Sequence, residues 1–289
     1  MNRHANNSRP SSVEAATNSR HPLTGWLAVA RFGFYTLSFS LIASLAFTPW
    51  LETLNLSWWK VFRRCVSLAA AASLWLCLRQ EGRSFASYGF SAWSGAGKRE
   101  LLTGLLVGAA CLAGLFGIGL FLGFYQVDVT QDRAKLWRTV IGFIPAAALV
   151  AALEEAIFRG FLLQQLLASS KTAAVLASSA LYSVVHLRTP LAELSTWMEL
   201  GGLFLLGVVL SLSYLKTNRL LFAVGLHGAL AYGARVNKLF IGHPYPELSW
   251  LIGTGRLVNG LIGWAALLGL GGWIGWRSRT DKGGGGHVA

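Results

Sequence analysis

The sequence is poor in charged residues, which make up only 13% of its 289 positions, whereas hydrophobic residues make up 54%. Soluble domains usually carry about 25% charged residues. A chain with half that share cannot cover a folded surface with groups that prefer water, and its mean hydropathy is +0.50. The composition therefore excludes an ordinary soluble domain and predicts a chain embedded in a lipid bilayer.

Acidic residues are especially scarce: 12 Asp and Glu stand against 25 Lys and Arg, which gives a formal net charge of +13. In a soluble protein such an excess would suggest nucleic-acid binding. Here the basic residues lie between apolar stretches, as is typical of loop charges that set membrane topology. We therefore expect the lipid bilayer as the surrounding partner and no nucleic acid.

Cysteine is also rare, and the sequence contains neither a Cys-x-x-Cys nor a His-Glu-x-x-His motif. Cys65, Cys77 and Cys111 lie in apolar surroundings, which favours small buried side chains over a disulfide or a metal site. The first residues are polar and lack the apolar core of a cleavable signal peptide. Residues 1–21 are interpreted as a disordered basic tail and residues 277–289 as a flexible tail.

Long apolar runs, in contrast, are abundant, and a spanning helix needs about 20 mostly apolar residues. Eight stretches are candidates, the second being short unless it extends back to Trp59, and residues 22–31 are expected as an interfacial helix before the first. The eight cover about residues 32–49, 65–78, 101–125, 140–167, 172–186, 200–214, 220–235 and 257–276. The predicted fold class is all-α, a polytopic membrane bundle of about eight transmembrane helices that forms a single domain over residues 22–276.

Loop charges predict the orientation of this bundle. The loops on the side of the two termini carry more Lys and Arg than the loops on the other side. Basic loops tend to stay in the cytoplasm. We therefore expect both termini to be cytoplasmic, and the expected location is a bacterial cytoplasmic (inner) membrane.

The fourth apolar stretch holds three ionisable residues within six positions, Glu154, Glu155 and Arg159. A charged group at the centre of a bilayer costs on the order of 3 kcal/mol to insert, so each of them needs a partner or a function. Glu155 and Arg159 are four residues apart, in the order that favours an ion pair on a helix. Glu154 is rotated from Arg159 by about 140°, so its partners must come from other helices, which makes it the sharper functional candidate.

Two histidines interrupt other apolar stretches: His186 ends the fifth, and His227 lies in the seventh between Gly225 and Gly228, which would allow close helix approach. A lone histidine in an apolar helix is more often a satisfied interior group than a catalyst. Two of them with an unpaired glutamate favour a site. The set could activate water, with the glutamate as general base, or it could ligate zinc, and the residues alone leave both chemistries open.

The candidate residues fall into three short motifs, which read Glu154-Glu155-x-x-x-Arg159, Tyr182-x-x-x-His186 and His227-x-x-x-Ala231. Their order and spacing resemble those of the CAAX prenyl endopeptidase and ABI family, the CPBP intramembrane glutamic proteases, over about residues 140–235. That family shows Glu-Glu-x-x-x-Arg, Phe-x-x-x-His and His-x-x-x-Asn. Tyr182 thus replaces a Phe, and Ala231 stands where a polar residue is typical.

The resemblance implies a membrane fold with an internal catalytic cavity and an endopeptidase that cleaves membrane-associated or lipid-modified peptides. It implies Glu154 as general base, His186 as the residue that orients the water, and His227 as an oxyanion contact. It implies no required metal or other cofactor, although zinc is not excluded. In eukaryotic members, cleavage removes the last three residues of prenylated proteins.

Ala231 leads to the alternative hypotheses. The polar residue of the family would lie one turn after His227 and help to bind the oxyanion, and losing such a donor costs about 100- to 1000-fold in rate. Tyr232 is rotated away and Asn237 lies too far along a straight helix. The chain is then a weak enzyme, an enzyme with a donor from elsewhere, or a non-catalytic protein for peptide binding, immunity or scaffolding. An ion-coupled transporter would need an inverted repeat, whereas the charged motif occurs once.

Overall fold

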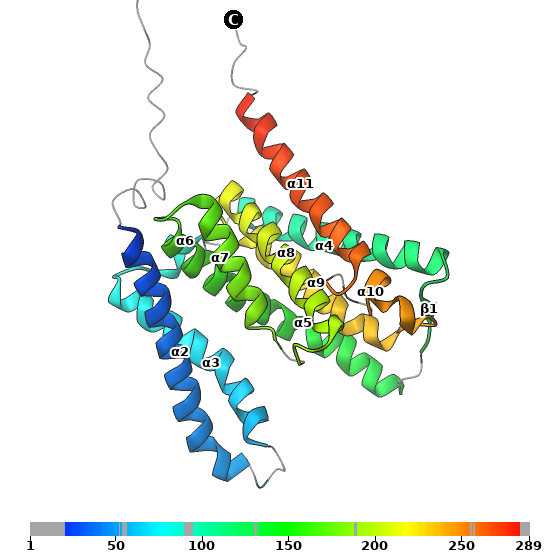
Figure 1. Cartoon of the computed structure of the whole chain (residues 1–289), viewed down its shortest axis with the longest axis horizontal. Coiled ribbons are helices and arrows are strands. Elements are labelled where there is room, and N and C mark those ends of the chain that lie inside the picture. Colours follow the sequence, from blue (N-terminus) through cyan, green and yellow to red (C-terminus); the bar gives the residue numbers. More distant parts are fainter. Residues whose placement is uncertain are drawn as a thin grey trace, which may run out of the picture.

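The computed structural model describes residues 21–283, apart from 52, 54–56, 90–94, 130–131, 188–189, 255 and 257. The long helices are α2 (Pro22–Leu51), α3 (Trp58–Gln80), α4 (Gly95–Phe121), α5 (Arg133–Glu155), α7 (Lys171–Val184), α8 (Leu194–Thr217), α9 (Leu221–Val236) and α11 (Leu261–Gly283) (Figure 1). Short helical pieces are η2 (Phe85–Tyr88), η3 (Ala156–Leu162), α6 (Leu163–Leu166), η4 (Asn237–Leu239), η5 (Pro246–Leu248) and α10 (Ser249–Ile252). Strands β1 (Gln126–Val127) and β2 (Ile241–Gly242) pair antiparallel, with Gln126 opposite Gly242. The predicted all-α class is confirmed.

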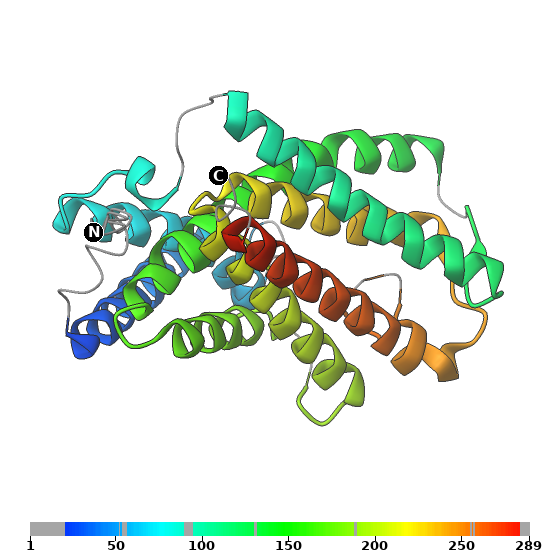
Figure 2. The ribbon, with the colours of Figure 1, turned by 90° about the horizontal axis from the view of Figure 1, so that it is seen from above.

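Helices α8 and α9 lie at the centre of the bundle. The most extensive contacts in this part are those of α4 and α5 with α9, and of α7 and α11 with α8 (Figure 2). Helices α2 and α3 form an antiparallel hairpin that extends away from this body and contacts it through α6 and η3 (Figure 1). The residues with the predicted chemistry therefore lie on the central helices and their direct neighbours.

Five helices are long and apolar enough to cross a membrane: Pro22–Trp50, Trp58–Gln80, Gly95–Phe121, Arg133–Leu166 and Leu194–Thr217. The other three predicted spans are helical but shorter, since α7 has 14 residues, α9 has 16, and the apolar part of α11 covers Leu261–Trp276. Within the described residues, five of the eight predicted spans thus form helices of full spanning length, and the other three form shorter helices. Helix α9 is enclosed by α4 and α5 and buries most of its length, so its apolar character reflects contact with protein.

Two predicted boundaries differ from the structure. Residues 22–31 are not a separate interfacial helix, because α2 continues without a break, and Gly25 packs against the backbone of Gln165 in α6. Helix α11 continues to Gly283, beyond the predicted start of a tail at residue 277. The remaining tail residues, 1–20 and 284–289, lie outside the described residues.

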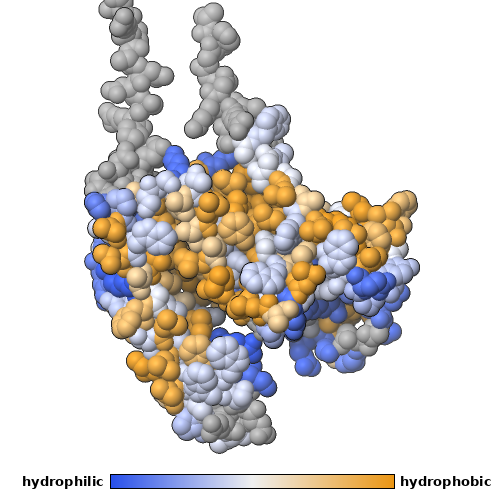
Figure 3. Space-filling model, viewed as in Figure 1, coloured by the Kyte–Doolittle hydropathy of each residue, from blue (hydrophilic) through white to orange (hydrophobic). Residues whose placement is uncertain are grey.

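The outer surface of the bundle is apolar. Phe34, Leu37 and Leu45 of α2, and Ile141 and Leu149 of α5, are all more than half exposed. Apolar side chains cover much of the face in Figure 3. Soluble proteins rarely expose contiguous apolar patches larger than a few hundred Å², so this surface is the one that faces lipid.

Helix α5 does not end at its two glutamates. It passes through the π-helical segment η3 into α6, so that residues 133–166 form one continuous helical path. All seven residues of η3 are buried. π-Helical turns within α-helices occur frequently at functional sites, and this one holds Arg159.

Glycines set the distance between α4 and α9. A Cβ at Gly225 would lie 2.3 Å from the carbonyl oxygen of Leu101, and a Cβ at Gly104 would lie 2.2 Å from that of Phe222. No real Cβ approaches backbone so closely, so both positions need glycine. Gly228 is different, since its added Cβ would meet only the Ala151 side chain, at 3.7 Å. The predicted close approach therefore depends on Gly225, and Gly228 does not contribute to it.

We expect Gly225→Ala to lower the melting temperature in detergent, because the new methyl group must push α4 away from α9. Overpacking of this kind costs about 1–3 kcal/mol. Gly228→Ala is the matched control on the same helix and should melt close to the wild type. Equal melting temperatures for Gly225→Ala and the wild type would contradict the proposed spacing role of this glycine.

Candidate active site

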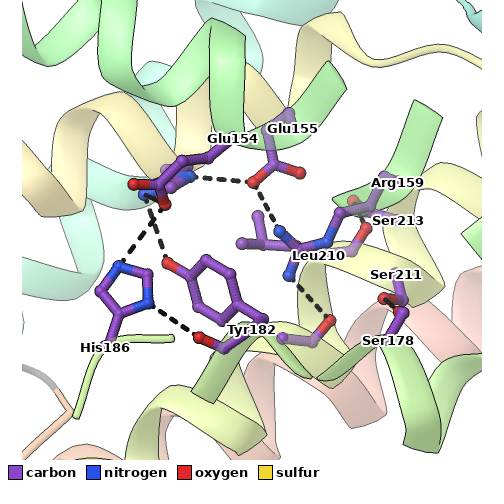
Figure 4. A network of polar contacts seen from close by, with 11 residues as sticks. Glu154, Glu155, Arg159, Ser178, Tyr182, His186, Leu210, Ser211 and Ser213 are labelled. Atoms are coloured by element: carbon purple, nitrogen blue, oxygen red, sulfur yellow. Dashed lines mark hydrogen bonds and ion pairs between the residues drawn. The ribbon is translucent and has the colours of Figure 1, made fainter. Parts of the chain in front are cut away.

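The structure brings the predicted residues of the three motifs together at the centre of the bundle (Figure 4). Glu154 and Glu155 are the last two residues of α5, and Arg159 lies in η3. His186 follows the end of α7, and His227 lies in the middle of α9. Three segments that are far apart in the sequence thus meet at one place.

Arg159 is fully buried and is held by groups from three segments. Its Nη1 donates to Glu155 Oε1 at 2.8 Å, and its Nη2 donates to the carbonyl oxygen of Gly207 in α8 at 3.2 Å. Its guanidinium carbon lies 4.6 Å from the ring centroid of Tyr182, a cation–π contact that is stronger away from water. The guanidinium therefore connects η3 with α5, α7 and α8.

Glu155 is also fully buried, and its carboxylate has a second partner. His227 Nδ1 lies 2.8 Å from Glu155 Oε1, the same oxygen that accepts from Arg159. A carboxylate only accepts hydrogen bonds, so the proton of a neutral His227 ring is on Nδ1. The other nitrogen, Nε2, then has a free lone pair and is directed away from Glu155.

Glu154 faces both histidines. Its Oε2 lies 3.6 Å from His186 Nε2 and 3.7 Å from His227 Nε2. These distances exceed that of a direct hydrogen bond and suit a single bridging water. No described residue donates a hydrogen bond to Glu154 Oε2. One carboxylate oxygen thus lies close to the Nε2 atoms of two imidazole rings.

His186 has a defined orientation. Its Nδ1 lies 2.8 Å from the carbonyl oxygen of Tyr182, and because a carbonyl can only accept, Nδ1 is the donor. In the neutral ring, Nε2 is then an acceptor that faces Glu154. The side chains of Glu154 and His186 are 23% and 17% exposed, whereas that of His227 is 7% exposed, so the side of Glu154 and His186 is the accessible one.

Tyr182 is a site residue that the sequence indicated only as a replacement for Phe. Its hydroxyl oxygen lies 3.4 Å from His227 Nε2, and its ring packs against that of His186, with centroids 4.7 Å apart and the ring planes tilted by 52°. Tyr182 precedes His186 by four residues. From the sequence, this spacing predicts that both residues lie on the same face of a helix. The phenol therefore adds a hydroxyl to the group formed by Glu154 and the histidines.

No polar residue takes the place of Ala231 within its own helix. Ala231 is half-buried and carries only a methyl group. The hydroxyl of the adjacent Tyr232 donates to the carbonyl oxygen of Val140 in α5 at 2.9 Å, and Asn237 lies in η4 beyond the end of α9. The hydroxyl closest to His227 Nε2 in the contacts described is that of Tyr182.

Metal ligation was the other chemistry that the sequence left open. Among the described residues, no three or more His, Cys, Asp and Glu side chains are grouped so that they could hold a metal ion. His227 uses Nδ1 for Glu155, which leaves only Nε2 for any other contact. An Nε2 left available in this way suits either chemistry, so the absence of a required metal stays a prediction.

A comparison with protein families identifies the region that contains this site. Residues 136–232 match the model for the type II CAAX prenyl endopeptidase Rce1-like family, about a third of the chain. All seven named residues of the three motifs lie within the match. No curated protein and no solved structure matches the chain significantly.

The matched family is one of peptidases, which supports a hydrolase kind of activity. With five helices among the described residues suited to crossing a bilayer, the chain is an integral membrane protein, and its residues 136–232 are similar to the type II CAAX prenyl endopeptidase Rce1-like family.

Proposed function

We propose that this protein is an intramembrane endopeptidase that hydrolyses a peptide bond of a membrane-associated or lipid-modified peptide, with Glu154 as the general base. The observation that carries the proposal is the position of Glu154 Oε2, 3.6 Å and 3.7 Å from the Nε2 atoms of His186 and His227. A water between these atoms is hydrogen-bonded on both sides. General-base assistance of this kind contributes typically about 10²–10⁴-fold in rate.

The hydrogen-bonding partners of His186 define its part in the proposed reaction. Because Nδ1 donates to the Tyr182 carbonyl, Nε2 accepts one hydrogen of the water while Glu154 accepts the other. The water oxygen then attacks the carbonyl carbon of the scissile bond as its proton moves to Glu154. Glu154 returns this proton to the leaving amine when the C–N bond breaks.

The negative charge that develops on the carbonyl oxygen needs a donor. With its proton on Nδ1 for Glu155, a neutral His227 offers only an acceptor at Nε2, so it becomes an oxyanion donor only when Nε2 is also protonated. Because Nε2 is then an acceptor, the Tyr182 hydroxyl, 3.4 Å away, donates to it in the structure. We therefore assign Tyr182 as the oxyanion donor that compensates for Ala231, with its hydroxyl turning from His227 Nε2 to the oxyanion when substrate binds.

The non-catalytic alternative, a peptide-binding, immunity or scaffold protein, is not favoured. It was motivated by the missing polar group at Ala231, and the Tyr182 hydroxyl supplies a polar group nearby. The family match is also to an endopeptidase family. Glu154, whose side chain is 23% exposed, faces two histidines, as the catalytic account requires.

Replacing Glu154 tests the central claim. In vesicles with a prenylated, membrane-tethered peptide library, the wild type should produce new peptide termini by mass spectrometry, and Glu154→Gln should lower kcat by about 10²–10⁴-fold without a change in melting temperature. Glu193→Gln, which removes an exposed carboxylate at the start of α8, is the control and should cleave normally. Absence of cleavage by the wild type, or equal rates for Glu154→Gln, would rule the mechanism out.

The role of Tyr182 has its own test. Tyr182→Phe removes only the hydroxyl and keeps the ring over Arg159, so we expect normal stability, an unchanged KM and a kcat lower by about 10²-fold, within the range for oxyanion donors. Ala231→Asn in the same chain places an amide one turn after His227 and should restore part of kcat. The control is Tyr232→Phe, because the Tyr232 hydroxyl donates to the carbonyl oxygen of Val140. A normal kcat for Tyr182→Phe would remove Tyr182 from the mechanism while leaving Glu154 untouched.

We also propose that the protein lies in a bacterial cytoplasmic membrane with both termini in the cytoplasm, which the basic loop charges support. Single cysteines introduced at Ser19 and at Ser278 in a cysteine-free chain should be protected from a membrane-impermeant thiol reagent in intact cells. They should react after the membrane is opened. Labelling of either cysteine in intact cells would reverse the orientation of that end.

A further inference from the structure

The tip of the hairpin formed by α2 and α3 carries three basic residues that the candidate active site does not use. Lys60, Arg63 and Arg64 lie in the first two turns of α3, and all three are exposed. The hairpin makes its main contacts with the body at its other end, through α6 and η3, and its tip extends away from the bundle (Figure 1). The surroundings of these basic side chains are therefore the bilayer and water, not the rest of the protein.

The charges at the two ends of the hairpin differ. Glu81, directly after α3, lies 3.4 Å from Arg31 of α2, so the end near the body has an ion pair. At the tip, none of Lys60, Arg63 and Arg64 forms an ion pair with a described residue. Lys60 and Arg64 are four residues apart and share one helix face, an arrangement of like charges that is unfavourable in isolation. The tip therefore lacks a negative partner.

Aromatic rings surround this basic group. Phe62 stacks with both Trp58 and Trp59, with ring centroids 5.2 and 5.6 Å apart, and the guanidinium carbon of Arg63 lies 6.0 Å from the centroid of the Trp59 ring. Trp58 and Trp59 are 39% and 56% exposed, and tryptophans concentrate at membrane interfaces. The rings therefore place this part of α3 at the level of the headgroups. The tip patch is defined by these residues: Trp58, Trp59, Lys60, Phe62, Arg63 and Arg64.

Helix geometry brings the two arginine side chains to the same level. The apolar part of α3 after them, residues 65–78, is about 21 Å long at 1.5 Å per residue, whereas the hydrocarbon core of a bilayer measures about 30 Å. Arg63 and Arg64 must therefore extend along apolar surface to bring their charges to water. Side chains on a helix are tilted toward its N-terminus, and the N-terminus of α3 is the tip. Both guanidinium groups are thus directed toward the headgroups.

Membrane topology alone does not account for the charges of the tip patch. With the N-terminus in the cytoplasm, as proposed, α2 carries the chain across the membrane, and the tip lies on the opposite side. Lys and Arg are normally scarce in loops on that side. Three of them without an acidic partner among the described residues favour a negative partner outside the chain. The contacts and charges of the patch are the same in either orientation.

We propose that the tip patch binds the headgroups of anionic phospholipids in the leaflet that surrounds it. The guanidinium groups of Arg63 and Arg64 donate to phosphate oxygens, which match their forked geometry, and Lys60 adds a third positive charge. A zwitterionic headgroup brings a positive charge of its own, so anionic headgroups are favoured. The bound lipids hold the tip in the membrane, while α6 and η3 hold the other end of the hairpin. The patch shares no residue with the proposed peptidase site and does not depend on it.

A fluorescent label at the tip measures which lipids surround it. Ser57 precedes α3, is exposed, and its side chain makes no capping hydrogen bond, so Ser57→Cys in a full-length chain without native cysteines can carry the label. The protein is placed in vesicles of equal parts phosphatidylglycerol and phosphatidylcholine, in which one of the two lipids carries bromine atoms that quench fluorescence. We expect the quenching to show phosphatidylglycerol enriched around the label at least about fivefold, the effect of one basic residue near an anionic surface.

Removing the two arginines tests whether the tip patch causes this enrichment. Arg63→Gln/Arg64→Gln should remove most of it, because the groups that hold the phosphates are gone. Arg133→Gln/Lys135→Gln is the matched control, since it removes the same charge from exposed positions at the start of α5, and it should keep the enrichment at the tip. Melting temperatures in detergent verify that both double variants fold.

Three outcomes would overturn the proposal. Equal quenching by the two brominated lipids in the labelled wild type would mean that the tip has no preference for anionic lipid. Unchanged enrichment in Arg63→Gln/Arg64→Gln would mean that other groups attract the lipid, and an equal loss in the α5 control would mean attraction by net charge alone. If the tip double variant does not fold, Arg64→Gln alone is measured, and an unchanged enrichment for it counts against the site.

Discussion

The buried carboxylate of Glu155 is the group on which the arrangement of the central helices depends. An arginine at the centre of a membrane protein costs about 2.5–3.5 kcal/mol on insertion scales, and Arg159 is fully buried. Glu155, on the same helical path, compensates the charge of Arg159. The Arg159 guanidinium also donates to the Gly207 carbonyl oxygen and lies over the Tyr182 ring. Loss of one partner of a buried ion pair typically destabilises by about 3–5 kcal/mol, so this pair determines how α5, η3, α7 and α8 fit together.

The same carboxylate also decides what His227 can do. By accepting from Nδ1, Glu155 fixes the ring orientation and directs Nε2 toward Glu154 and Tyr182. A structural ion pair and a catalytic orientation are thus functions of one side chain. The adjacent Glu154 has the opposite environment, with partial exposure and no hydrogen bond to its Oε2 within the described part of the chain. The difference between the two glutamates comes from the helix rotation between neighbouring residues.

The sequence predicts contacts within one helix better than contacts between helices. The pairing of Glu155 with Arg159 follows from a spacing of four, and the helical nature of the apolar stretches follows from their length. The contact of Glu155 with His227 spans 72 residues, and no local pattern encodes it. Residues 22–31 were interpreted as an interfacial helix because no local pattern reveals that Gly25 packs on α6. Likewise, α7 and α9 are apolar enough to resemble full spans but are shorter; α9 buries most of its residues against other helices, whereas Leu176 and Val184 of α7 are exposed.

Helix α9 carries His227 and packs most extensively against α4. His227 lies two residues after Gly225, about 3 Å along the helix at 1.5 Å per residue, so a shift of α9 against α4 moves the imidazole. Gly225 fixes the separation of α9 from α4 through backbone contact. Catalytic groups must be held within about 0.5 Å of their productive positions, and rigid backbone contact provides this better than flexible side chains. The glycine contact therefore fixes the position of α9, while the hydrogen bond from His227 to Glu155 fixes the orientation of the imidazole toward Glu154.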